Sequence, residues 1–203
     1  MPSHHLLCYT ISMLETHPFK PYIPPNARIL LLGSFTGRAD IGSDKGKAHR
    51  SFDWYYGSRR NQFWPILRTV YRTNLETKAE KTALFDALHM AITDIILKCE
   101  RKANSNLDTN LSKIVYNKRA IRKILSENEI RTIYFTSKYV ESTFKKIFRF
   151  EGLDHSDINQ LSLPSPSPRY ASMSLHEKIR VYSKLLPKLR RKTARQRGCR
   201  IGK

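Results

Sequence analysis

The chain has 203 residues, which is too short for two full-sized domains. Its formal net charge of +20 favours a polyanionic partner over a small neutral one. It contains no apolar run of the roughly 18 residues that span a bilayer, and its N-terminus lacks the pattern of a secretion signal. Three widely spaced cysteines, Cys8, Cys99 and Cys199, argue against a disulfide framework or a zinc site. We therefore expect an intracellular protein that needs no metal and makes no membrane contact.

Residues 1–27 are predicted to form an N-terminal approach segment, because they end in Pro-Tyr-Ile-Pro-Pro-Asn and proline opposes helix. The apolar run from Arg28 to Gly33 then has the pattern of a buried strand in a parallel sheet. A turn bracketed by Gly33 and Gly37 follows, at the end of a strand where open α/β sheets place their ligands. Its glycine spacing fits no nucleotide-binding motif, so no cofactor is predicted.

The densest stretch of candidate functional side chains runs from Tyr55 to Leu67, after a polar loop over residues 38–53. Arg59 and Arg60 could contact phosphates, and Asn61 could orient a water or read a base edge. Asn61 could equally cap a helix predicted over residues 61–72, because apolar residues follow it at helical spacing. Both roles remain open at this point. The large rings of this stretch, on which bases could stack, are Tyr55, Tyr56, Phe63 and Trp64.

The middle of the chain alternates between predicted helices and predicted strands. A helix over 77–89 precedes a second buried strand over 90–96, which Asp94 interrupts. Asp94 could face a pocket, or it could lie just past the strand and cap a turn. A polar loop over 101–113 and a basic amphipathic helix over 114–125 are predicted to follow.

The last part of the predicted domain begins with a strand over 130–135, rich in β-branched and aromatic residues. Ser137 is predicted to cap the next helix, and a short strand is predicted over 161–163. Prolines alternating with serines then fix a rigid, extended loop over 164–170 before a closing helix over 175–186. Eight basic residues and no acidic ones lie in the tail, 188–203, which we expect to be disordered until it binds.

Four segments together make the chain similar to the uracil-DNA glycosylase superfamily, and most like its hypoxanthine- or uracil-directed branch. They are Leu-Leu-Leu-Gly-Ser-Phe-Thr-Gly, Tyr-Tyr-Gly-Ser-Arg-Arg-Asn-Gln-Phe-Trp, Ile-Thr-Asp-Ile-Ile-Leu-Lys-Cys-Glu-Arg and Leu-Pro-Ser-Pro-Ser-Pro, in that order along the chain. The resemblance implies one α/β domain over residues 28–187. It implies a three-layer α/β/α sandwich around a short, mostly parallel central sheet.

The resemblance also assigns roles residue by residue. Asn61 resembles the catalytic Asn of the hypoxanthine-directed branch, and Asp94 falls where many members carry a base-reading Asn. Phe35 replaces the water-activating residue of most branches and resembles a ring available to a flipped base, while Leu163 replaces a His of the commonest family. The implied base pocket comprises Gly33, Ser34, Phe35, Tyr56, Phe63 and Asp94.

The DNA contacts implied by the resemblance lie on two segments. The loop over 164–170 would press on the DNA backbone, and Arg169 or Tyr170 would fill the space left by the flipped base, since Ser167 is too small. Tyr170 could instead pack under the last helix against Leu175 and Ile179. The implied DNA-binding residues are Arg59, Arg60, Pro164, Ser165, Pro166, Ser167, Arg169 and Tyr170.

The implied function is that of a monofunctional DNA N-glycosylase, a hydrolase of base-excision repair. It would flip uracil or hypoxanthine out of DNA and hydrolyse the bond to deoxyribose. The chemistry needs neither metal nor organic cofactor. We expect a monomer that acts on duplex or single-stranded DNA, in the cytoplasm of a bacterium or the nucleus of a eukaryote. The alternatives are a catalytically silent nucleic-acid-binding relative and an enzyme acting on a related nucleoside or RNA.

Overall fold

A four-stranded parallel sheet forms the centre of the computed structural model, which describes residues 14–36, 53–101, 110–149 and 157–189. Its strands run in the order β3-β2-β6-β7. Because every pair is parallel, the carboxyl ends of the strands meet at one edge of the sheet. The strands are β2 (Ile29–Gly33), β3 (Met90–Asp94), β6 (Thr132–Phe135) and β7 (Asn159–Ser162).

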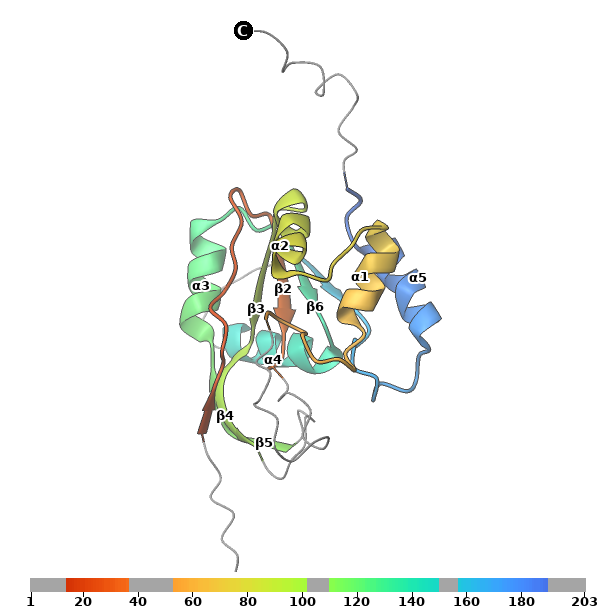
Figure 1. Ribbon diagram of the computed structural model, residues 1–203. Coiled ribbons are helices and arrows are strands. Elements are labelled where there is room, and N and C mark those ends of the chain that lie inside the picture. The colour runs from red at the N-terminus through yellow and green to blue at the C-terminus, as the bar shows by residue number, and fades with distance from the viewer. Residues whose placement is uncertain (1–13, 37–52, 102–109, 150–156, 190–203) are drawn as a thin grey trace, which may run out of the picture.

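Helices cover both faces of this sheet, which confirms the predicted three-layer α/β/α sandwich (Figure 1). Alternating side chains of a strand point to opposite faces. Leu31 accordingly packs in the cluster with α1 (Phe63–Tyr71), α2 (Lys78–Ala87) and α5 (Leu175–Leu185). Leu30 and Leu32 pack in the cluster with α3 (Lys118–Glu127) and α4 (Lys138–Arg149).

A second, antiparallel sheet extends the fold beyond the central one (Figure 1). Its order is β1-β4-β5, built from β1 (Leu14–Thr16), β4 (Ile96–Arg101) and β5 (Leu111–Tyr116). β4 follows β3 after the single residue Ile95, and β1 pairs with β4. The predicted approach segment therefore contributes a strand to the folded structure, which its sequence pattern did not indicate.

The bounds of three predicted elements around this second sheet were wrong. The strand predicted over 90–96 is two strands, because the chain leaves the central sheet after Asp94 and enters the second one at Ile96. The loop predicted over 101–113 begins on the last residue of β4 and ends inside β5. The helix predicted over 114–125 starts only at Lys118, because the β-branched and aromatic residues before it pair with β4 instead.

Side-chain caps fix the starts of α2, α4 and α5. The Ser137 hydroxyl accepts a hydrogen bond from the Val140 amide at 3.3 Å, which confirms the predicted cap of α4. Thr77 with Glu80, and Ser174 with Glu177, form capping boxes that start α2 and α5. At α1 the N-cap position is Gln62, one residue later than predicted.

No helix within these described segments is both long enough and apolar enough to cross a membrane. Cys99 is buried and forms no disulfide within the described residues, whereas Cys8 and Cys199 lie outside them. Most of the loop predicted over 38–53 and most of the tail predicted over 188–203 also lie outside them.

Candidate active site

The site is built where β2 and β3 end side by side. Gly33 and Asp94 are register partners at the carboxyl ends of these strands. A Cβ on residue 33 would overlap Asp94 Oδ1 and Tyr56 Oη, so only glycine leaves room for both groups. Tyr56 has a φ of 55°, a left-handed conformation that a bulky residue adopts only where its surroundings impose it. A required glycine at position 33 and a left-handed backbone at Tyr56 therefore bring the Asp94 carboxylate and the Tyr56 phenol together.

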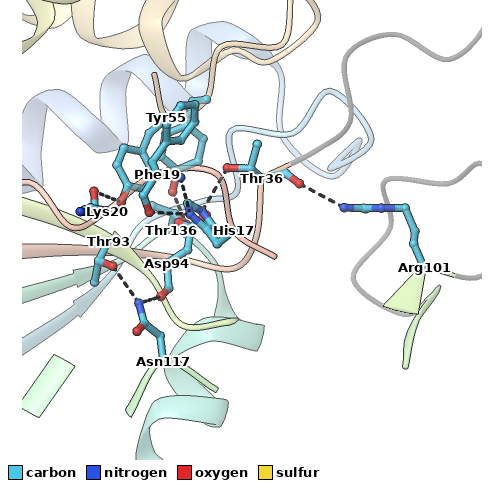
Figure 2. A network of polar contacts seen from close by, with 11 residues as sticks. His17, Phe19, Lys20, Thr36, Tyr55, Thr93, Asp94, Arg101, Asn117 and Thr136 are labelled. Carbon is cyan, nitrogen blue, oxygen red and sulfur yellow. Dashed lines mark hydrogen bonds and ion pairs between the residues drawn. The ribbon is translucent and has the colours of Figure 1, made fainter. Parts of the chain in front are cut away.

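His17 binds the Asp94 carboxylate in the interior of the protein (Figure 2). Its Nε2 donates to Asp94 Oδ2 at 2.9 Å, and the side chains are only 4% and 5% exposed. The Thr36 hydroxyl lies 3.1 Å from the same nitrogen. The segment after β1 thus brings an imidazole to a carboxylate 77 residues away in the sequence.

The other ring nitrogen of His17 suits both protonation states. Nδ1 lies 2.9 Å from the Phe19 carbonyl oxygen and 3.1 Å from the Phe19 amide nitrogen. Protonated Nδ1 can donate to the carbonyl, and unprotonated Nδ1 can accept from the amide. Burial alone would lower the pKa of His17, but the hydrogen bond and negative charge of Asp94 outweigh it and raise this pKa above 6.5.

One oxygen of Asp94 has no hydrogen-bond partner within the described residues. Oδ2 is held by His17, whereas Oδ1 is buried and unpaired beside Gly33. A buried polar atom without a partner costs about 1–3 kcal/mol, so such atoms are rare except where a function uses them. Asp94 therefore has one oxygen fixed in position and one left for another group.

Neutral aromatic side chains surround this carboxylate. The Tyr56 hydroxyl donates to Thr136 Oγ1 at 3.1 Å, and the Tyr55 hydroxyl donates to the Lys20 carbonyl at 3.0 Å. Burial and the Asp94 charge raise the pKa of both phenols, so both stay protonated near neutral pH. The Phe35 ring centroid lies 5.5 Å from that of His17, in an edge-on arrangement. Asp94 thus sits in an environment of low polarity, which strengthens its electrostatic effect.

Hydrogen bonds behind the site hold its strands and turn in place (Figure 2). The Asn117 amide donates to Thr93 Oγ1 and to the Asp94 carbonyl, both at 3.2 Å. Arg101 donates to the Thr36 carbonyl at 3.1 Å and lies 5.5 Å from the Phe35 ring, while it pairs with Glu15 on β1. The turn after β2 is therefore fixed by groups from the second sheet.

Asn61 caps the start of α1 although it is not at the N-cap position. Its Oδ1 accepts from the Phe63 amide at 2.9 Å. Arg59 and Arg60 precede it and are exposed. The Phe63 ring is buried and stacks on Tyr56 with centroids 4.2 Å apart, which links this turn to the Asp94 carboxylate. A carbonyl oxygen has two lone pairs, so the cap leaves Asn61 able to accept a second hydrogen bond.

The proline-serine loop lies against the turn that carries Asn61. The Gln62 amide donates to the Pro166 carbonyl at 2.9 Å. Lys178 of α5 donates from Nζ to Gln62 Oε1 at 2.8 Å and to the Ser167 carbonyl at 2.9 Å. The Tyr182 hydroxyl donates to the Pro164 carbonyl at 2.9 Å. α1, α5 and the loop therefore form one connected unit.

The structure brings together most, though not all, of the residues predicted for the base pocket and its surroundings. The Asp94 carboxylate has Gly33, Phe35 and Tyr56 around it, and Phe63 lies behind Tyr56. Tyr55 and Trp64 are core residues, 1% and 6% exposed, so their rings are not free surfaces. Tyr170 is 41% exposed and its ring lies 5.4 Å from Lys178 Nζ.

Two residues central to this geometry, His17 and Lys178, were not predicted. His17 precedes Pro18 in a segment with no strand pattern, and only its pairing through β1 places it beside Asp94. Lys178 belongs to a helix rich in polar residues, where a lysine normally faces water. Within the described residues, no cluster of three or more His, Cys, Asp or Glu side chains could hold a metal ion.

The fold occurs in a solved structure of another protein. A solution NMR structure described as a "putative Uracil DNA glycosylase" from Methanosarcina acetivorans superimposes with a TM-score of 0.56 and 18% sequence identity. The match covers 85% of this chain and 98% of that one. No protein-family model and no curated protein matches the sequence. The likeness shows a shared fold.

Proposed function

We propose that the chain is a DNA glycosylase of the uracil-DNA glycosylase superfamily, a hydrolase that removes a deaminated base such as uracil or hypoxanthine. The observation that carries the proposal is the buried Asp94 carboxylate. One of its oxygens is bound by His17, and the other is unpaired at the carboxyl edge of the parallel sheet. The fold shared with the archaeal protein supports a glycosylase.

The reaction that this site suits is hydrolysis of the bond between the base and C1′ of deoxyribose. That bond breaks with its electron pair going to the base nitrogen, while positive charge develops on the sugar. Water oxygen bonds to C1′, and the proton that the water loses ends on the departing base. A fixed carboxylate in a site of low polarity stabilises the sugar cation electrostatically. Asp94 would supply this charge without forming a covalent bond.

Asn61 is proposed to hold the attacking water. Its carbonyl oxygen caps Phe63 and still has a lone pair for a water proton. An amide is too weak a base to deprotonate water, so it would orient the molecule toward a sugar that is already strongly electrophilic. The water proton would leave only as the bond to C1′ forms.

The flipped base is proposed to enter between the turn after β2 and the partly buried Tyr56. Gly33 and Ser34 would offer backbone at close range, Phe35 and Tyr56 would offer ring surfaces, and Phe63 would support Tyr56 from behind. Stacking and phosphate contacts repay the few kcal/mol that extruding a base costs. Asp94 would lie on the side of this pocket where the base joins its sugar.

DNA would be held by the basic turn and the proline-serine loop, which touch each other. Arg59 and Arg60 are exposed beside Asn61, and Arg169 is exposed on the loop. Pro164, Ser165, Pro166 and Ser167 would press on the backbone beside the lesion. Arg169 or the exposed Tyr170 would then enter the space left by the flipped base.

The test uses duplexes that carry a single uracil, hypoxanthine or xanthine. The full-length protein is incubated with each, and strands are scored for alkali-labile abasic sites, with an undamaged duplex of the same sequence as control. We expect cleavage at one or more of the three bases and none in the control. Tight binding without abasic sites on any duplex would contradict an enzyme and support the silent nucleic-acid-binding relative.

A further inference from the structure

Lys178 is a buried lysine at the junction of three elements. It lies on α5 and is 1% exposed. Nζ donates to Gln62 Oε1 at the start of α1 and to the Ser167 carbonyl in the loop, at 2.8 and 2.9 Å. The Tyr170 ring lies 5.4 Å from the same nitrogen. We call the group of Gln62, Ser167 and Lys178 the lysine clamp.

Within the part of the chain that the structure describes, the cation of the lysine clamp has no anionic partner. No carboxylate of the described residues lies within ion-pair distance of Lys178 Nζ, unlike Lys81, which is also buried but pairs with Asp53 at 3.0 Å. Burial lowers the pKa of Lys178 below 10.5, as expected where nothing of opposite charge offsets the loss of water. An ammonium group so placed is costly, because its attraction to a counter-charge is missing.

The loop above the clamp presents two hydroxyl groups. Ser165 Oγ accepts from the Ser167 amide at 3.3 Å, and Ser167 Oγ accepts from the Arg169 amide at 3.3 Å. Neither hydroxyl proton has an acceptor among the described residues, so both protons can be donated to an outside group. Ser167 thus touches the buried ammonium through its carbonyl and offers a donor through its hydroxyl.

We infer that Lys178 is a positioning residue whose buried charge is balanced by a phosphate of bound DNA, and that it holds the proline-serine loop against the turn carrying Asn61. The inference rests on DNA as the proposed partner, but not on base excision. A phosphate accepting from the Ser167 hydroxyl would lie about one Debye length or less from Nζ, roughly 8 Å at physiological salt. The free protein would then carry an uncompensated charge that DNA binding relieves.

The first test compares Lys178→Met with Lys184→Met, an exposed lysine on the same helix. Affinity for an undamaged duplex is measured by fluorescence anisotropy, and Tm is measured in parallel. We expect Lys178→Met to weaken duplex binding about tenfold, because it removes the charge that is inferred to face a DNA phosphate. Its Tm should not fall, because the substitution also removes the cost of an unpaired buried charge. Lys184→Met should stay within about twofold of the wild type. A folded Lys178→Met protein with wild-type affinity would overturn the inference.

A second measurement separates a positioning role from a merely structural one. Phosphates of the duplex are replaced one at a time by neutral methylphosphonate. The wild type should lose affinity sharply at one or two positions, and Lys178→Met should no longer respond at these positions. Equal losses at every position in the wild type would contradict the inference even if the Lys178→Met variant fails to fold. If the position-specific losses occur but no base is excised, the proposed function fails and this inference stands.

Discussion

Two regions at the same edge of the sheet each bury a charged side chain, and they treat it in opposite ways. The acidic centre, made of His17, Gly33, Tyr56 and Asp94, surrounds a carboxylate with strand backbone and a histidine whose pKa this carboxylate raises. The lysine clamp buries an ammonium group that has carbonyl acceptors but no carboxylate partner among the described residues. The first charge has an ionisable partner within the protein, whereas we infer that the second is balanced by a phosphate of bound DNA.

This difference suggests that the acidic centre acts in cleavage and the lysine clamp acts in DNA binding. A carboxylate fixed by His17 between two strands keeps its position whether or not ligand is present, which suits a group that must act on a transition state. An unpaired cation under a loop gains most when an anion arrives, which suits a group that acts in binding. Variants of the acidic centre should therefore reduce cleavage more than DNA affinity, and variants of the clamp should do the reverse.

Asn61 gives one of the largest expected effects and a sharp test of this division, because it lies next to Gln62 of the clamp. Asn61→Ala should slow single-turnover cleavage at least about 100-fold, since the water loses its orienting group, and leave duplex affinity nearly unchanged. Losing the cap should also lower the free energy of unfolding by about 1 kcal/mol.

Asn61→Ser is the matched control, because a serine hydroxyl can still cap the Phe63 amide. We expect it to recover stability and to remain as slow as Asn61→Ala. Recovery of cleavage together with stability would mean that Asn61 acts only through the helix. An Asn61→Ala variant that loses more duplex affinity than cleavage rate would show that Asn61 acts in binding, as the lysine clamp is inferred to do.

Gly33→Ala should have the next largest effect. Its Cβ would overlap Asp94 Oδ1 and Tyr56 Oη, so the carboxylate or the phenol must move. Because a displacement of about 1 Å can cost roughly 100-fold in rate, we expect a loss of that order with duplex affinity kept. Rate and affinity are measured on one preparation whose Tm is known. Cleavage at the wild-type rate would show that the close packing of Asp94 and Tyr56 against residue 33 does not matter for the reaction.

His17→Gln should produce a smaller change, which depends on pH. The folded-state pKa of His17 lies above 6.5, so the ion pair stabilises fully below pH 6.5 and its contribution is lost as the pH rises through the folded-state pKa. Urea unfolding should therefore show a larger difference between wild type and His17→Gln at pH 6 than at pH 9. A difference that is the same at every pH would contradict the ion pair.

The clamp should show the opposite dependence on pH. The pKa of Lys178 is lowered from 10.5 in the folded protein, so the unfolded chain binds more protons between the two values. The wild type should gain stability relative to Lys178→Met as the pH rises toward 10.5. Urea unfolding of both proteins between pH 8 and 10.5 checks this expectation. A wild type that loses stability relative to Lys178→Met as the pH rises would contradict an unpaired charge on Lys178.

The basic tail should have the smallest effect and belongs to neither region. Deleting residues 190–203 removes seven basic residues and no acidic ones. Duplex binding should weaken, and the slope of log affinity against log salt should become shallower, because fewer counterions are released. The identity of the excised base should not change. An unchanged slope would show that these residues do not contact DNA.

Much of the fold could be predicted because its elements have local signals. The apolar runs at β2 and β6 and the helical spacing in α1, α2 and α4 identified these strands and helices, and the resemblance to a known family implied their three-layer arrangement. The second sheet could not be predicted in the same way. β1 has three residues, and the apolar run through Ile95 hides the change of sheet between β3 and β4. Such strands are defined by their partners rather than by their own sequence.

The same limit explains which site residues could be predicted. Gly33 and Asp94 lie at the ends of apolar runs, and Asn61 lies at the start of an amphipathic helix, so all three have a local context. His17 gains its role only through the pairing of β1 with β4, and Lys178 only through packing of α5 against the loop and α1. Contacts between residues far apart in sequence leave no local pattern.

The single-turnover cleavage rate of Asp94→Asn tests most directly whether the charge of Asp94 acts in cleavage. The substitution keeps the shape of the side chain and removes the charge that is proposed to stabilise the sugar cation. We predict a fall of about 100- to 1,000-fold in rate on the best of the three damaged duplexes, with duplex affinity within about threefold of the wild type and a folded protein by Tm. Cleavage at the wild-type rate would show that Asp94 serves only as the structural partner of His17.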